Sequence, residues 1–200
     1  MARVPLVGLT GGLGAGKSEA LRALGELGAA TLSADAVVHE LLSGDELRDI
    51  VVARLGDEVA LDGQLDRSLI AERVFGDDEA RKWLEGELWP RVGERMGEWK
   101  QEVDERDPPP PAAVVEVPLL FESGMEPVFD ATIAVIADED IRAERAGARG
   151  HAAVEERTGR QLSQEEKAHK ADYAVRNDGT LEELREKLSR VLARLDSPPR

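Results

Sequence analysis

The sequence lacks cysteine, long hydrophobic runs and enough basic residues to balance its acidic ones. The absence of cysteine excludes disulfides, thiolate metal sites and cysteine nucleophiles, and it fits a reducing compartment. No stretch approaches the roughly 18 consecutive apolar residues of a membrane-spanning helix. The apolar run near residues 3–9 is too short for a secretory signal. We therefore expect a cytoplasmic protein that does not insert into a membrane.

Positive charge is also scarce, because 41 acidic residues face 26 basic ones and the formal net charge is -15. Such a charge repels nucleic acids and anionic lipids at long range, so we expect neither as a partner. A chain of 200 residues can bury one sizeable core with smaller lobes attached. We expect a monomer or a weak homo-oligomer.

Short apolar segments alternate with helical ones along much of the chain. Predicted strands cover residues 3–9, 29–34, 112–117, 131–137 and, more weakly, 173–176, and predicted helices cover 17–27 and 180–195. The clear strands are apolar on both faces, which is typical of a buried parallel sheet. This alternation predicts an α/β fold that binds ligands at the carboxyl ends of its strands.

The long segment between residues 36 and 107 has helical periodicity and predicts a helical insertion. Its turns are expected at residues 43–45, 61–66 and 76–78. The run DPPPP at 107–111 cannot be helical, since proline lacks an N–H and constrains the residue before it. We expect this run to return the chain to the sheet.

Four glycines, at positions 11, 12, 14 and 16, precede Lys17 and Ser18. The segment matches G-x-x-x-x-G-K-[ST], the P-loop, between a predicted strand and a predicted helix. Backbone N–H groups at Gly12, Gly14, Ala15 and Gly16 can converge on phosphate oxygens in front of the helix N-terminus. Lys17 is expected to reach the β and γ phosphates of ATP, and Ser18 to bind Mg²⁺. The alternative is a glycine-rich turn without a ligand.

Other P-loop classes leave no clear trace in the sequence. A guanine-nucleotide switch should carry an N-K-x-D motif, which the sequence lacks, and a motor ATPase should carry a strand that ends in Asp-Glu. The strand at 112–117 instead has Glu116 followed by valine and proline. These observations favour a small-molecule kinase.

Arginines are concentrated in one segment, at positions 142, 145, 149, 157 and 160. Arg142, Arg145 and Arg149 fall at i, i+3 and i+7, on one helical face. Arginines on a lid could neutralise the charge of a transferring phosphoryl group, with Arg142 catalytic and Arg145 bound to ATP. The alternative is a solvated face, because acidic residues are interleaved with these arginines.

Asp35 follows the second predicted strand, at the edge of the sheet where the P-loop lies. It could accept a proton from an acceptor hydroxyl, which would make it catalytic. Alternatively, it caps a helix that begins at Ala36. The two roles are compatible.

With these residues identified, the chain resembles the dephospho-coenzyme A kinase family over nearly its whole length. The matching segments are GLTGGLGAGKS (8–18), SADAVVHELL (33–42), LDRSLIAERVF (65–75), VEVPLLFESGM (115–125) and EEKAHKADYAVRNDGTLEEL (165–184). The P-L-L-F-E signature after a P-loop is the most specific of them. The sequence departs from the family pattern at Ser33, at Trp89 and around Arg142.

The resemblance implies transfer of the ATP γ-phosphoryl group, with Mg²⁺, to the ribose 3′-hydroxyl of dephospho-coenzyme A. By matching position, Asp35 is the base or orienting acid, His39 and Arg67 lie near the acceptor, and Asn177 lies near the adenine. Leu119, Leu120 and Glu122 are further candidates for substrate contact. The alternatives are an ordinary helical histidine for His39, core packing for the two leucines, and a turn cap for Glu122.

The implied fold is a three-layer P-loop NTPase with a five-stranded parallel sheet, a helical substrate-binding insertion and an arginine-rich lid. The expected divisions are core at 1–34, 108–138 and 166–200, substrate lobe at 35–107, and lid at 139–165. Two other functions stay open: another small-molecule or nucleoside-monophosphate kinase, and a nucleotide-dependent regulatory switch.

Overall fold

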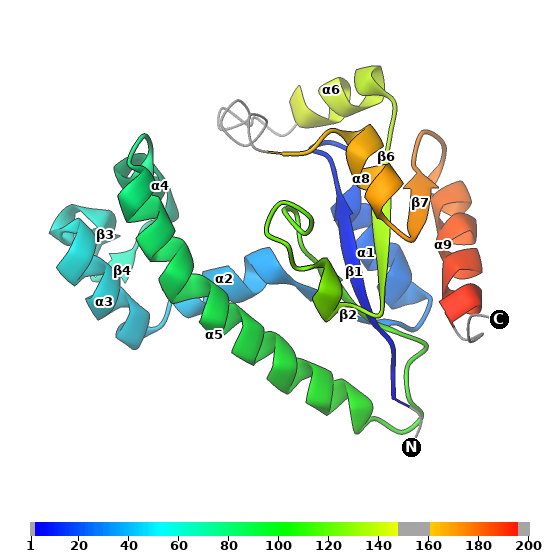
Figure 1. Ribbon diagram of the computed structural model, residues 1–200, viewed down its shortest axis with the longest axis horizontal. Coiled ribbons are helices and arrows are strands. Elements are labelled where there is room, and N and C mark those ends of the chain that lie inside the picture. Colours follow the sequence, from blue (N-terminus) through cyan, green and yellow to red (C-terminus); the bar gives the residue numbers. More distant parts are fainter. Residues whose placement is uncertain (1–2, 148–160, 196–200) are drawn as a thin grey trace. The chain divides into compact units, whose positions relative to one another are not determined.

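The computed structural model describes residues 3–147 and 161–195 (Figure 1). The chain forms two compact units. One, here the sheet unit, combines Met1–Ser33 with Lys100–Arg200, and the other, here the helical unit, is Ala34–Trp99. Each unit is described separately below. The assignment of residues 35–107 to the substrate stays a prediction.

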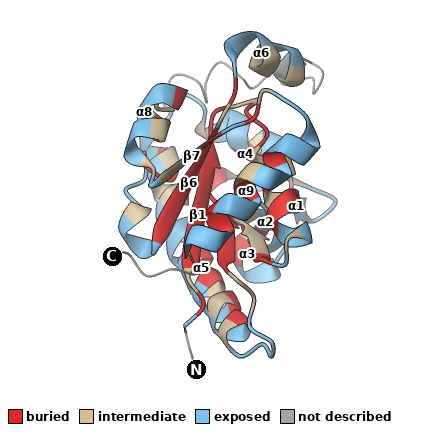
Figure 2. Ribbon diagram, turned by 90° about the vertical axis from the view of Figure 1, so that its right-hand side faces the viewer, coloured by how far each residue is buried: buried red, intermediate tan, exposed pale blue. Residues whose placement is uncertain are grey.

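The sheet unit contains a five-stranded parallel sheet, which confirms the predicted fold class. Its strands are β1 (Leu6–Gly11), β2 (Ala30–Ser33), β5 (Ala113–Glu116), β6 (Ala131–Ile136) and β7 (Tyr173–Arg176), in the spatial order β2-β5-β1-β6-β7. Leu9 of the central strand β1 is aligned with Glu116 on one side and Ile133 on the other. Strands β1 and β6 are almost entirely buried (Figure 2). Every predicted strand is present, although β1 begins three residues later than expected.

Helices cover both faces of this sheet, with α8 (Gln164–Lys170) on one side and α1 (Lys17–Glu26) and α9 (Leu181–Leu195) on the other (Figure 2). The sequence explains how α9 packs. Its apolar residues recur at helical spacing and are buried against α1 and the sheet: Leu184, Leu188, Val191 and Leu192. Each such side chain contributes roughly 1.5–3 kcal/mol on burial. The three layers therefore hold the carboxyl ends of the strands in fixed register.

Two shorter elements complete the described part of the sheet unit. The 3-10 turn η2 (Glu126–Val128) precedes β6, and helix α6 (Glu139–Gly147) follows it. The face of β1 toward the segment after β5 is tightly packed, because a Cβ on Gly8 would overlap Cδ1 of Leu120. Close packing on this face places the loop after β5 directly against β1.

The helical unit contains α2 (Ala34–Leu42), α3 (Asp45–Leu55), the 3-10 turn η1 (Asp57–Val59), α4 (Arg67–Val74) and most of α5 (Asp78–Asp104). The three predicted turns all separate elements. The middle one is a hairpin between β3 (Ala60–Leu61) and β4 (Gln64–Leu65), with positive φ at Asp62 and Gly63. Such a pair favours a tight two-residue turn. The unit has its own core, which includes Leu47, Val51, Leu55, Val59 and Ile70.

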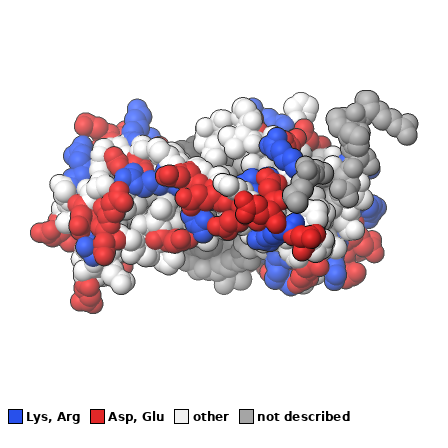
Figure 3. All heavy atoms as spheres, turned by 90° about the horizontal axis from the view of Figure 1, so that it is seen from below, with Lys and Arg blue, Asp and Glu red and all other residues white. Residues whose placement is uncertain are grey.

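The surface reflects the acidic composition. On the face in Figure 3, acidic and basic side chains lie beside one another. Many of these charges form local ion pairs, such as Arg81 with Glu85 at 2.9 Å and Arg48 with Asp49 at 3.0 Å. Among the described residues, no helix combines the length and the hydrophobicity needed to cross a membrane.

Candidate active site

The phosphate loop, residues 11–18, joins the carboxyl end of β1 to the start of α1 in the sheet unit. Its lysine folds back over the loop, since Lys17 Nζ donates to the carbonyl oxygen of Gly12 at 3.1 Å. Gly14 lies close against the backbone of α6, because a Cβ there would lie 2.5 Å from the carbonyl oxygen of Arg142. The loop is therefore held in a defined shape by its own lysine and by α6.

The N-terminus of α1 has no side-chain cap. Its N-cap residue is Gly16, which has a φ of 92°, a left-handed conformation that favours glycine. The first N–H groups of a helix lack intrahelical partners and carry the positive end of the helix dipole. Phosphate oxygens satisfy such groups. The geometry of this helix start fits the triphosphate of a nucleotide, and the exposed Ser18 lies in its first turn.

Two predicted arginines of α6 contact this region. Arg142 Nε donates to the carbonyl oxygen of Leu13 at 2.9 Å, and a Cβ on Gly12 would lie 3.3 Å from Arg142 Nη2. A guanidinium carries five N–H donors, so this contact uses only part of its capacity. Arg145 Nη1 donates to the backbone oxygen of Asn177 at 3.0 Å. Arg149, Arg157 and Arg160 lie outside the described residues.

Asn177, which follows β7, is buried beneath the phosphate loop. Its side-chain Nδ2 donates to the carbonyl oxygen of Ala15 at 2.9 Å, and its backbone N–H donates to Ile136 at 2.8 Å. A Cβ on Gly16 would overlap this Nδ2 atom. The residue thus anchors the loop to the ends of β6 and β7. Contact with the adenine of ATP stays a prediction.

Sequence reasoning missed Gln164, in the first turn of α8. Its side-chain amide makes two bonds to one residue: Oε1 accepts from the Ala137 N–H at 2.9 Å, and Nε2 donates to the Ala137 carbonyl at 2.8 Å. A Cβ on Gly12 would lie 3.0 Å from Gln164 Cγ. The residue joins α8 to the end of β6 behind the loop. No local pattern could reveal it, because the partner lies 27 positions away.

The segment after β5 forms a hydrogen-bonded turn, in which the Ser123 N–H donates to Leu119 at 3.0 Å. Leu119 is half-buried, whereas Leu120 is fully buried against Gly8, which favours the core-packing alternative for Leu120. Glu122 Oε1 accepts from the Leu162 N–H at 2.9 Å and pairs with Lys167 at 2.9 Å. These contacts join Glu122 to Leu162 and to α8, and the predicted substrate contact and the alternative of a turn cap both stay predictions.

Three predicted residues belong to the helical unit, and all three are exposed: Asp35, His39 and Arg67. Helix α2 begins at Ala34 rather than Ala36, so Asp35 lies inside its first turn and is not the N-cap of a helix that starts later. An acid in a first turn interacts favourably with the helix dipole. His39 lies in the last turn of α2, and Arg67 is the first residue of α4, after the N-cap Asp66.

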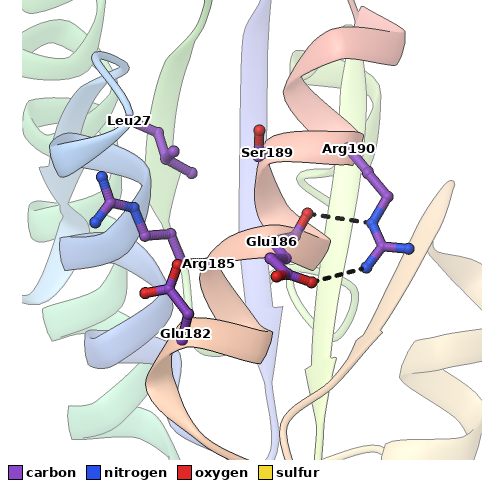
Figure 4. Close-up of a pocket in the computed structure, with 6 residues that line it drawn as sticks. All are labelled: Leu27, Glu182, Arg185, Glu186, Ser189 and Arg190. Atoms are coloured by element: carbon purple, nitrogen blue, oxygen red, sulfur yellow. Dashed lines mark hydrogen bonds and ion pairs between the residues drawn. The ribbon is translucent and has the colours of Figure 1, made fainter.

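A groove between α9 and the end of α1 is separate from the phosphate loop. Leu27 and α9 side chains line it, and Arg190 Nη2 lies 3.7 Å from a carboxylate oxygen of Glu186 (Figure 4). Leu27 follows the last turn of α1, whereas the phosphate loop precedes the first turn. The rise along ten helical residues is about 15 Å. The groove therefore belongs to the other end of α1.

Comparison with known proteins agrees with this geometry. The family model described as dephospho-CoA kinase matches residues 5–183. A dephospho-CoA kinase of Protochlamydia amoebophila is 41% identical over 200 aligned positions, which cover 98% of each chain.

Two solved structures resemble the chain over nearly its whole length. The structure of TT1252 from Thermus thermophilus has a TM-score of 0.80 at 34% identity, and it covers 97% of this chain and 99% of its own. A dephospho-CoA kinase from Campylobacter jejuni has a TM-score of 0.68 at 27% identity, with 95% and 96% covered. The structure comparison and the sequence comparison thus both include a protein named dephospho-CoA kinase.

Proposed function

The chain belongs to the dephospho-CoA kinase family, and from this premise we propose how its residues carry out the family's reaction. It is a kinase that transfers the γ-phosphoryl group of ATP to the ribose 3′-hydroxyl of dephospho-CoA, the final step of coenzyme A synthesis. The observation that carries the proposal is the phosphate loop, where Lys17, Arg142 and Asn177 converge on one uncapped helix start.

Phosphoryl transfer requires little covalent chemistry from a protein, so positioning and charge stabilisation supply the catalysis. Backbone N–H groups from Gly12 to Ser18 would hold the phosphates of ATP, and the Ser18 hydroxyl would hold Mg²⁺. When bound, Mg²⁺ neutralises charge on the phosphate oxygens. Lys17 would contact the β and γ phosphates, and Arg142 would use its remaining N–H donors to stabilise charge on the transferring group. Arg145 and Asn177 would complete the nucleotide side.

The acceptor side is assigned to exposed polar residues of the helical unit. Asp35 follows β2 by two residues along the chain and would orient the ribose hydroxyl or accept its proton. Arg67 offers the planar donors that bind phosphate in pairs, and His39 offers a second donor. Leu119 would supply an apolar wall. Glu122 would influence the substrate indirectly, by fixing the turn to which it belongs. Leu120 would do so by packing in the core beneath that turn.

The cellular setting is also a proposal. The formal charge of -15 argues against nucleic acid and anionic membrane as partners. We place the chain in the cytoplasm as a monomer or a weak homo-oligomer. Size-exclusion chromatography with light scattering measures the assembly directly.

One assay separates the candidate functions. We expect ADP release to depend on dephospho-CoA, and to be far slower with AMP or without an acceptor. Preference for AMP would indicate a nucleoside-monophosphate kinase. Slow release that no acceptor stimulates would indicate a nucleotide-dependent switch. Omission of Mg²⁺ in the same assay tests the predicted requirement for the metal.

The role of Asp35 is tested by Asp35→Asn, which keeps the shape of the side chain and removes its charge. Loss of a general base costs about a hundredfold or more in rate. We expect kcat to fall by that order while the KM for dephospho-CoA changes little. Asp45→Asn, in the first turn of α3 in the same unit, is the matched control. A rise in KM alone would reduce Asp35 to a binding residue.

A further inference from the structure

Lys167 of α8 is one of the largest fully buried side chains of the described chain, with 0% of its side chain exposed. A buried ammonium group is costly unless it is paired and hydrogen-bonded. Lys167 Nζ meets both conditions, because it donates to the Pro118 carbonyl at 2.7 Å and lies 2.9 Å from Glu122 Oε1. One ammonium group thus joins the two ends of the turn at 118–122.

The carboxylate of Glu122 depends on this lysine. Its Oε1 atom also accepts the Leu162 N–H at 2.9 Å. Its Oε2 atom is buried and has no hydrogen-bond partner among the described residues. Without the ammonium group, the carboxylate would keep one backbone donor in a buried setting. Lys167 therefore fixes the direction of this side chain.

The same turn is joined to the start of the phosphate loop. The Pro118 carbonyl accepts a second hydrogen bond, from Thr10 Oγ1 at 3.1 Å, and Thr10 is fully buried. Thr10 is the residue before Gly11, where β1 ends. The Val117 N–H also donates to Leu9 at 2.8 Å. One carbonyl oxygen therefore links β1, the turn after β5 and α8.

We propose that Lys167 is a positioning residue for the acceptor side of the reaction: through Pro118 and Glu122 it sets the turn at 118–122 relative to the phosphate loop. This inference rests on the proposed function. Packing alone does not explain a lysine here, because apolar side chains often replace a buried ion pair without loss of stability. The turn follows a strand at its carboxyl end, which is where ligands bind in such sheets.

The proposal predicts an asymmetry between the two substrates. The phosphate loop is shaped by contacts that do not involve Lys167, from Lys17 to Gly12, from Asn177 to Ala15 and from Arg142 to Leu13. ATP binding should therefore survive the loss of Lys167. The turn at 118–122 should not keep its position, and a displacement of about 1 Å can cost a hundredfold in rate.

The test is Lys167→Met, with steady-state kinetics in both substrates. We expect kcat/KM for dephospho-CoA to fall about tenfold to a hundredfold, while the KM for ATP and the rise in Tm on adding ATP stay close to those of the unaltered chain. The matched control is Lys170→Met, which alters an exposed lysine of the same helix. It should change neither kcat/KM for dephospho-CoA nor the KM for ATP. Equal losses for both substrates, or no loss, would overturn the proposal.

A second variant separates positioning from folding. Lys167→Met combined with Glu122→Gln removes both charges of this ion pair, and we expect Tm to recover relative to Lys167→Met alone. Activity with dephospho-CoA should stay low, because the link from α8 to Pro118 is still missing. Recovery of activity together with Tm would show a purely structural role. If the unaltered chain itself shows no release of ADP that depends on dephospho-CoA, the proposed function fails and this inference with it.

Discussion

Helices α1 and α8 both belong to the sheet unit, yet they begin in opposite ways. At α8 the Glu166 N–H donates to Ser163 Oγ at 3.1 Å, and the Ser163 N–H donates to Glu166 Oε2 at 2.8 Å. This reciprocal capping box satisfies the helix start from within the chain. At α1 the N-cap is Gly16, with no side-chain cap. A helix start that the chain leaves uncapped is available to a ligand, and this contrast separates a stability element from a binding element.

The largest effect should follow Lys17→Ala at the uncapped start. Removal of one preorganised donor to a developing charge typically costs a hundredfold or more in rate, so we expect kcat to fall by about that factor or beyond. The Tm without ATP should stay near its original value, because the hydrogen bond from Lys17 Nζ to the Gly12 carbonyl oxygen lies within the loop. Steady-state kinetics measures the fall in kcat, and calorimetry measures the Tm. Near-normal turnover would contradict the proposed role.

Gly16→Ala should damage both binding and stability. The new Cβ would meet Asn177 Nδ2, and a left-handed conformation in a residue other than glycine costs about 1–3 kcal/mol. We expect a lower Tm and a higher KM for ATP. The control is Gly93→Ala in α5, where nothing lies within 4 Å of the added methyl group and the helix should be stabilised. Similar results at both positions would show that the loop tolerates a side chain.

Ser163→Ala tests the capped start of α8. Loss of an N-cap serine typically costs about 1 kcal/mol, so Tm should fall while the KM for ATP is unchanged. Ser189→Ala, at an exposed position inside α9, is the control and should raise stability slightly, because alanine is the better helix former. A changed KM for ATP in Ser163→Ala would show that the start of α8 also influences nucleotide binding at the start of α1.

The smallest effect concerns pH. The Ser163 N–H holds the pKa of Glu166 below its usual range. A carboxylate with a lowered pKa stabilises the folded state above its unfolded pKa, about 4.3, and this contribution is lost as pH falls through the folded value. Glu166→Gln should therefore lower Tm at pH 7, and the difference from the unaltered chain should shrink toward pH 3.5. Glu165→Gln is the control. A difference that does not vary with pH would exclude the charge as the cause.

Local patterns predicted what local chemistry controls. The strand and helix order, the P-loop and the turn at residues 61–66 follow from apolar runs, glycine and hydrophobic periodicity, and the structure contains them. The start of α2 was placed two residues too late, at Ala36 rather than Ala34, because the polar Asp35 suggested a cap. Boundaries depend on tertiary packing, which a single sequence does not display.

The contacts that complete the site were beyond such patterns. Asn177 bonds to Ala15 across 162 positions, and Arg142 to Leu13 across 129. The resemblance to a family predicted Asn177 near ATP, and the arginine cluster predicted Arg142 there, but neither indicated that these residues support the loop backbone. The sequence analysis assigned no role to Lys167, and its burial is evident only from the fold. Roles that depend on partners far away in sequence need coordinates.

All three tryptophans of the chain, Trp83, Trp89 and Trp99, lie on α5 and fall within the helical unit. Fluorescence excited at the indole band therefore originates from side chains of that unit, while the single tyrosine, Tyr173, lies in β7 of the sheet unit. A change in indole emission on adding dephospho-CoA, absent with nucleotide alone, would support binding of the acceptor to the helical unit without any dye.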